Sequence, residues 1–191
     1  MNRQGSNMKT SLLALALAAA LPLSAQAADK LSYTSVEADY VNLDNGIDGW
    51  GLRGSVDIGS TGFYGLGSYS WTKHDASPSD LDIRSNELGI GYHHSLNGNT
   101  DLLGEVAYRN ADFDGNLNID GLRTSVGVRS ELGERVEGFV KANHYDLSDY
   151  NGDFSGTVGG QVKLNQTWGA TAEAELGNGD QAYLVGVRAS F

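Results

Sequence analysis

The residues best suited to chemistry in this 191-residue chain are histidines that lie close to aspartates. His144 precedes Asp146 and Asp149, and His74 is followed directly by Asp75. A histidine oriented by a carboxylate can act as a general base, as it does in many hydrolases. Neither a G-x-S-x-G motif nor a metal-ligand spacing accompanies these pairs, and aspartate is abundant around them. The sequence therefore predicts no catalytic residues, and a hydrolase built on these pairs is kept as an alternative.

A second candidate site is the segment Asp112–Asp120, in which oxygen-bearing side chains alternate as they do in calcium-binding loops. The match is incomplete, because Gly115 stands at the fourth position rather than the sixth and Arg123 occupies the place of the bidentate glutamate. Asp, Asn and Gly are also ordinary turn residues. We therefore predict no metal site and no cofactor.

The elements that must position these residues are strands, because apolar and polar side chains alternate along most of the chain after residue 30. In the last segment every second residue is apolar, up to the terminal Phe191. We predict ten strands, at 31–41, 50–58, 62–72, 83–94, 101–110, 121–130, 135–144, 154–164, 168–176 and 183–191. Eight strands are an alternative if 62–72, whose phase is ambiguous, or the alanine-rich 168–176 is not a strand.

These lengths and faces predict a transmembrane barrel. A tilted strand of about 9 to 11 residues crosses the hydrocarbon layer of an outer membrane. Aromatic residues on the apolar phase fall at strand ends, as expected for two interfacial girdles: Tyr40, Trp50, Trp71, Tyr108, Phe154 and Tyr183 on the loop side, and Phe63, Tyr92, Trp168 and Phe191 on the turn side. We therefore predict an all-β, antiparallel, up-and-down barrel in the outer membrane of a Gram-negative bacterium, with the long loops outside the cell.

The polar phase of the strands predicts a charged interior. Eight acids and seven bases share it: Glu37, Asp39, Asp57, Glu87, Glu105, Glu137, Glu173 and Glu175, with Arg53, Arg109, Arg123, Arg129, Lys141, Lys163 and Arg188. Near-equal numbers favour a network of ion pairs. We expect a packed structural interior, because small barrels leave little room after side chains, and a narrow channel is the alternative.

The N-terminus predicts export. Arg3 and Lys9 precede an apolar run, 12–21, which is followed by a small-residue Ala-Gln-Ala exit site. We predict a signal peptide at 1–27 and a mature barrel domain at 28–191. The chain contains no cysteine, which excludes a lipoprotein and disulfides, and its formal charge of −11 argues against a nucleic-acid partner.

Several motifs resemble the small outer-membrane β-barrel proteins of the Ax type, a family of xanthomonads and their relatives. The resemblance rests on Leu-Ser-Tyr at 31–33, Gly-Ile-Gly-Tyr at 89–92, the turn at 161–169 and the terminal aromatic residue. More broadly, the mature region is similar to small closed barrels of the OmpX and OmpA kind. The Ax-type resemblance implies an integral outer-membrane protein that is shed in membrane vesicles and associated with biofilm formation, and it supplies no catalytic residues.

From these observations we expect a monomeric, non-enzymatic protein with a structural and surface-interaction role in the envelope. A narrow channel or small-ligand transporter is the alternative, followed by a hydrolase at the barrel rim. The expected partners are outer-membrane lipid, lipopolysaccharide and the barrel-assembly machinery. The phosphates of lipopolysaccharide would share divalent cations with loop aspartates, and the assembly machinery would recognise the strand that ends in Phe191.

Overall fold

The computed structural model describes residues 31–74, 81–113, 117–148, 150–177 and 181–191. These residues form ten strands and one short 3₁₀ helix, η1 (Asp44–Gly46). The strands are β1 (Ser35–Leu43), β2 (Ile47–Asp57), β3 (Phe63–His74), β4 (Leu81–Asn97), β5 (Thr100–Phe113), β6 (Leu117–Gly133), β7 (Val136–Leu147), β8 (Tyr150–Lys163), β9 (Trp168–Leu176) and β10 (Gln181–Ser190). Within the described ranges, no helix is long and apolar enough to span a membrane.

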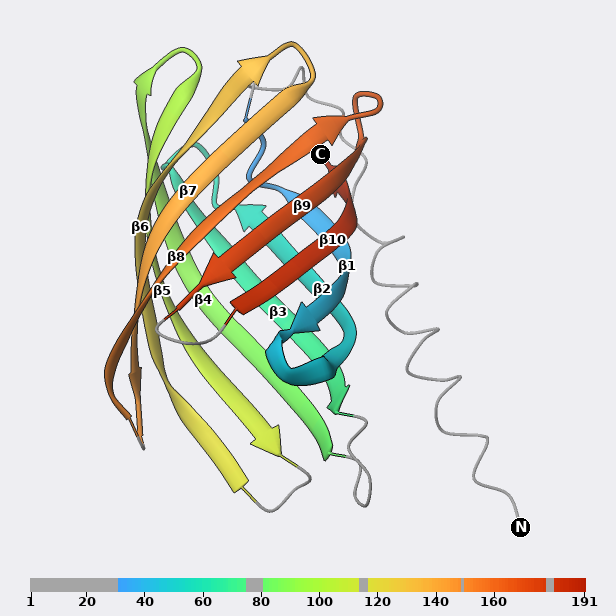
Figure 1. The fold of residues 1–191 in the computed structure, drawn as a ribbon. Helices are drawn as coiled ribbons and strands as arrows, with labels where there is room; N and C mark the ends of the chain where they lie inside the picture. Colours follow the sequence, from blue (N-terminus) through green and yellow to red (C-terminus); the bar gives the residue numbers. More distant parts are fainter. Residues whose placement is uncertain (1–30, 75–80, 114–116, 149, 178–180) are drawn as a thin grey trace.

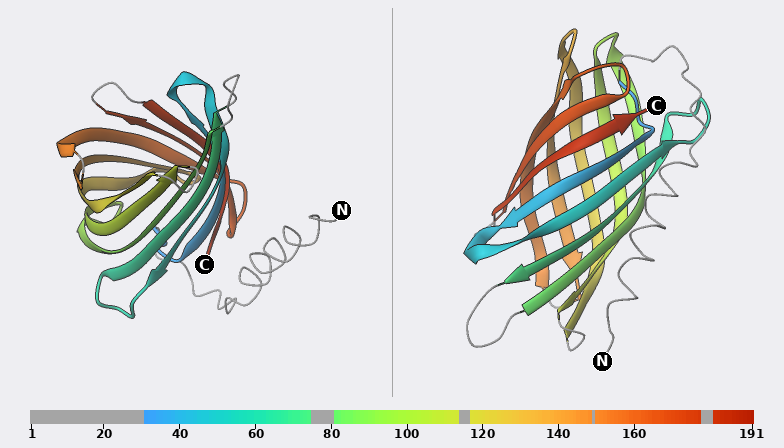
Figure 2. Two further views of the ribbon diagram at one scale, coloured as in Figure 1. Left: turned by 90° about the horizontal axis from the view of Figure 1, so that it is seen from below. Right: turned by 90° about the vertical axis from the view of Figure 1, so that its right-hand side faces the viewer.

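The ten strands close into a single antiparallel barrel (Figure 1). Each strand pairs with its neighbours in sequence, and β10 returns to β1, with Ser35 opposite Ser190 and Leu43 opposite Ala182. Closure pairs the backbone groups of every strand, which is what a sheet requires in order to cross lipid. The strands are steeply tilted around the barrel axis (Figure 2). The predicted ten-stranded barrel is confirmed, and the eight-stranded alternative is wrong.

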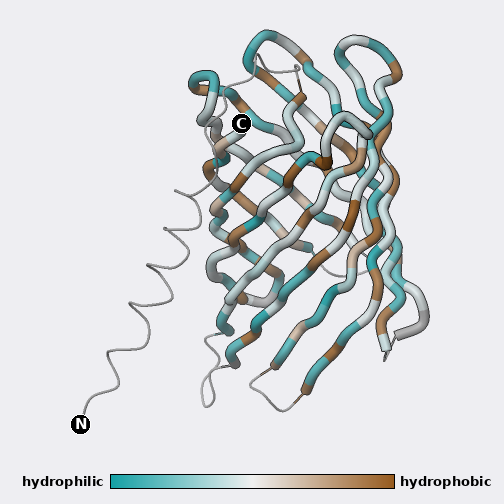
Figure 3. Tube along the Cα trace, turned by 180° about the vertical axis from the view of Figure 1, so that it is seen from behind, coloured by the Kyte–Doolittle hydropathy of each residue, from teal (hydrophilic) through white to brown (hydrophobic). Residues whose placement is uncertain are grey.

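The outer wall of the barrel is apolar. Large hydrophobic side chains from every strand are exposed on it, among them Trp50, Leu88, Phe154 and Val185. Along each strand these residues alternate with polar ones (Figure 3). So continuous an apolar surface is expected where lipid is the solvent.

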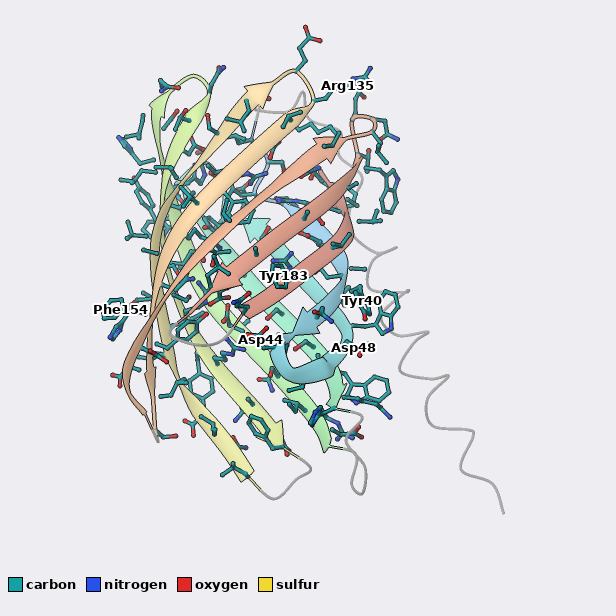
Figure 4. All side chains as sticks on the ribbon, in the orientation of Figure 1. Tyr40, Asp44, Asp48, Arg135, Phe154 and Tyr183 are labelled. Carbon is teal, nitrogen blue, oxygen red and sulfur yellow. The ribbon has the colours of Figure 1, made fainter. Side chains whose placement is uncertain are left out.

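The tyrosines of the outer wall mark its boundary on the loop side. Tyr40 and Phe154 point away from the barrel on opposite sides of it (Figure 4). The Tyr40 hydroxyl donates a hydrogen bond of 3.0 Å to Asp48. Tyr108 makes the equivalent bond of 3.1 Å to Asp120. A ring in lipid with its hydroxyl in a polar layer is the arrangement of an interfacial girdle.

Several strands are longer than the sequence pattern predicts. The predicted loop at 111–120 is mostly strand, because β5 continues to Phe113 and β6 begins at Leu117. Beyond the girdle, polar side chains on the outer face bond across strands: the Asn110 amide donates to Asn118 over 2.5 Å. The sequence analysis limits each strand to the length that crosses the membrane. In the structure, hydrogen bonding between β5 and β6 continues beyond that length.

Candidate functional site

Inward-facing ions on β1, β2 and β9 form the first of three charged groups, which we call the Arg53 group. The Arg53 guanidinium binds Asp39 through Nε at 2.9 Å and Glu37 through Nη2 at 2.8 Å. Its Nη1 binds Glu173 at 2.6 Å. Asp39 is only 1% exposed. One cation therefore holds three carboxylates on this side of the interior.

The second set, the Arg123 group, lies on β4 to β7, on the opposite side of the ring of strands. Arg123 Nη2 binds Glu87 at 2.6 Å, and Nη1 binds Glu105 at 3.0 Å. Lys141 Nζ lies 3.4 Å from Glu105, to which the Tyr64 hydroxyl also donates, over 2.8 Å. Here two carboxylates share two cations, and Arg109 adds a third base on the same wall.

The third set lies near the turns. Glu137 on β7 binds Arg129 of β6 and, at 2.6 Å, Lys163 of β8. Lys163 also lies 3.5 Å from Glu131. Asp101 and Glu131 are inward-facing ions that the sequence pattern does not place in the interior, because each lies where a strand was expected to begin or end.

Between the Arg53 and Arg123 groups the barrel encloses a cavity of about 330 Å³. Among the described residues, its lining includes six carboxylates and six bases: Glu37, Asp39, Glu87, Glu105, Glu173 and Glu175, with Arg53, Arg109, Arg123, Arg129, Lys141 and Arg188. The ion pairs of both groups join side chains on the same wall, so the space between the walls stays open. The expectation of an interior filled throughout by side chains is therefore wrong.

The segment at 31–34, just before β1, also differs from the prediction. Residues 31–34 are expected to begin the first strand, but β1 begins at Ser35. Leu31 and Tyr33 are instead buried inside the barrel, at the turn end. Leu-Ser-Tyr at 31–33 gives no signal of this, because alternating polar and apolar residues look the same in a strand and in a segment that leaves it.

The histidine and calcium candidates are not assembled into a site in the described part of the chain. The His144 ring packs against Phe154, with centroids 4.6 Å apart, on the outer face. Asp75, Asp114 and Asp149 lie outside the described residues. Within the described residues, no group of three or more His, Cys, Asp or Glu side chains could hold a metal ion.

A closed barrel with an apolar outer wall and a charged, partly open interior defines a transmembrane protein of the bacterial outer membrane. Residues 2–116 match the family model of the Gram-negative porins, and the chain belongs to that family. The protein is therefore located in the outer membrane, as predicted. No match to a curated protein is found.

Solved structures of small porins share the fold. The KdgM porin in complex with disordered oligogalacturonate is 13% identical, with a TM-score of 0.55, over 82% of this chain and 99% of that one. The NanC porin is 11% identical, with a TM-score of 0.51, over 83% of this chain and all of that one (100%). At these identities the likeness is one of fold.

The expected structural and surface-interaction role is wrong. The match to the Gram-negative porin family points instead to a channel, which is the alternative reading of the sequence. The charged residues of the polar phase were predicted correctly. The open space between them was not predicted, because near-equal numbers of acids and bases do not reveal whether the pairs form along the walls or across the lumen.

Proposed function

We propose that this protein is a narrow passive channel for small polar solutes across the outer membrane. The observation that carries the proposal is the direction of the ion pairs. Arg53 binds carboxylates of β1 and β9, and Arg123 binds those of β4 and β5, so each cation is satisfied on its own wall. Charges paired in this way do not reach across the lumen, and a polar cavity remains between the two groups.

The lining of the cavity favours neutral or zwitterionic solutes. Its carboxylates and bases are equal in number, so a net charge on the solute adds little to its attraction to the lining. The wall of β1 and β9 is richer in carboxylates and that of β5 to β7 in bases, which suits a solute with separated charges. The KdgM structure holds oligogalacturonate. A polycarboxylate of that kind would meet Glu37, Asp39, Glu173 and Glu175 here.

Size limits the solute further. The cavity of about 330 Å³ is at the small end of the range of about 300–1,000 Å³ that is typical of small-molecule sites. We therefore propose solutes of the size of a monosaccharide or a single amino acid.

Liposome swelling tests this proposal. Vesicles that contain the folded protein should swell in glucose and in glycine and should not swell in the trisaccharide raffinose. Folding is checked by the shift in gel mobility on heating, and vesicles with heat-denatured protein are the control. Absence of swelling in all three solutes with folded protein, or equal swelling in glucose and raffinose, would contradict the proposal.

Three expectations from the sequence, which are narrower than membership of the porin family, remain predictions. They are the cleaved signal peptide at 1–27, the Ax-type resemblance carried by the turn at 161–169, and the absence of catalysis, which membership of a porin family favours. Sequencing of the N-terminus of the membrane-extracted protein tests the first, since a retained apolar run at 12–21 would exclude cleavage.

A further inference from the structure

The segment that precedes β1 lies across the interior of the barrel. The Tyr33 hydroxyl donates a hydrogen bond of 2.9 Å to Asp101 on β5. The Tyr33 ring stacks on His93 of β4, with centroids 4.0 Å apart and planes 9° apart. The Arg129 guanidinium of β6 lies 5.1 Å from the centre of the same ring. Since β5 and β6 are four and five strands from β1 in a ring of ten, the Tyr33 side chain reaches the far wall.

The backbone of this segment is fixed as well. The Ser32 carbonyl accepts hydrogen bonds from Arg129 at 2.9 Å and from Arg188 at 3.2 Å, and these arginines come from β6 and β10. The Ser32 hydroxyl donates to the Phe191 carbonyl over 2.8 Å. Contacts from both sides of the barrel therefore hold the segment in one position.

Around this segment an apolar cluster lies among these charged contacts. Leu31, Tyr33, Tyr64 and Leu103 form a buried hydrophobic cluster, with Leu66 against it. Tyr64 fits there because it faces Gly91: a Cβ at that position would lie 2.2 Å from the ring. A narrow, partly apolar constriction in a polar lumen resists water and ions, because they lose part of their hydration in passing it.

The cavity ends at the same level. Tyr33, Tyr64 and Leu103 line it, together with the charged walls on the loop side. Among the described residues, the third charged group near the turns contributes only Arg129 to the lining, and Glu137 and Lys163 are not part of it. The lumen is thus wide above Tyr33 and narrows at it.

We infer that Leu31, Ser32 and Tyr33 form the constriction of the channel and that the Tyr33 side chain sets its permeability. This inference rests on the proposed channel function. The Tyr33 ring narrows the lumen and its hydroxyl binds Asp101, and hydrogen bonds from Arg129 and Arg188 hold the Ser32 carbonyl to two walls. Solutes that enter the wide, charged part from the loop side would meet this ring last.

Single-channel recording in planar bilayers tests the inference with three variants. Tyr33→Ala removes the ring and should raise conductance several-fold. Tyr33→Phe keeps the ring and loses only the bond to Asp101, so its main conductance should stay close to that of the natural protein, with more frequent opening and closing. Tyr145→Ala is the matched control: this inward tyrosine binds Glu175 at 2.5 Å along the wall and lines the wide part. Because the narrowest point dominates the resistance, this control should change conductance little.

A cysteine probe covers the case in which Tyr33→Ala folds poorly. The chain contains no cysteine, so Tyr33→Cys provides a single thiol. We expect a bulky, charged methanethiosulfonate reagent to reduce the current of Tyr33→Cys in one irreversible step and to leave the natural protein unaffected. An unchanged current after complete modification would overturn the inference.

The outcomes separate the inference from the proposed function. If the natural protein conducts and Tyr33→Ala conducts equally, the constriction lies elsewhere and the channel stands. If neither conducts although both show the heat-dependent mobility of folded barrels, the channel itself is wrong, and the inference with it. A several-fold rise confined to Tyr33→Ala supports both.

Discussion

Replacing Arg53 by alanine should destabilise the folded barrel by about 3–5 kcal/mol, the usual cost of removing one partner from a buried ion pair. The guanidinium holds Glu37, Asp39 and Glu173, and Asp39 is almost completely buried. Without the cation, these carboxylates would repel one another with little water to screen them. Urea unfolding in phospholipid vesicles, followed by tryptophan fluorescence, measures the loss as a lower midpoint.

Arg109→Ala is the control for this prediction. Arg109 also lies on the inner wall, but the contact that the structure records for it is with the Tyr145 ring, 5.6 Å away, and such a contact contributes about 1 kcal/mol. Adding Asp39→Asn to Arg53→Ala should restore part of the lost stability, because one of the repelling charges is removed. The ion-pair explanation fails if Arg53→Ala costs no more than Arg109→Ala, or if Asp39→Asn makes the variant still less stable.

The strands could be predicted because a barrel in lipid enforces the alternation of side chains more strictly than a soluble sheet does. β3 is the exception, since Phe63, Tyr69 and Trp71 are apolar on one phase and Tyr64 and Leu66 on the other. In the structure the first set faces lipid, whereas Tyr64 is buried inside and Leu66 packs against the same interior cluster. The cluster that accepts them includes Tyr33, which precedes β1, and Leu103 of β5. Both are distant from β3 in sequence, so no local pattern could assign the phase.

The charged residues of the site could also be predicted, but their partners could not. Arg53 and Glu173 are separated by 120 residues and meet only because β10 returns to β1. Glu87 and Arg123 meet across β5, which lies between their strands. Whether such pairs fill a lumen or leave it open depends on registers and rotamers. The expectation of a packed interior rests on the small size of the barrel, and the structural role that followed from it is wrong.

Two single neutralisations should shift the ion selectivity of the channel in opposite directions. The cavity carries equal numbers of carboxylates and bases, so the natural protein should show weak selectivity in a KCl gradient. Glu175→Gln leaves an excess of one positive charge and should move the reversal potential toward that of chloride. Lys141→Gln leaves an excess of one negative charge and should move it toward that of potassium. In a lumen this narrow, with low-dielectric walls, one uncompensated charge dominates the local potential.

The double variant, Glu175→Gln with Lys141→Gln, provides the internal control, because its lining is balanced again and its reversal potential should return to that of the natural protein. Glu175→Gln keeps the size of the side chain, Lys141→Gln keeps a polar one, and Arg123 still binds Glu105 when Lys141 is lost. High salt should reduce all the shifts, since it screens the charges. Unchanged reversal potentials in both single variants, or shifts of the same sign, would contradict this prediction, and the charged groups would then not set the ion selectivity.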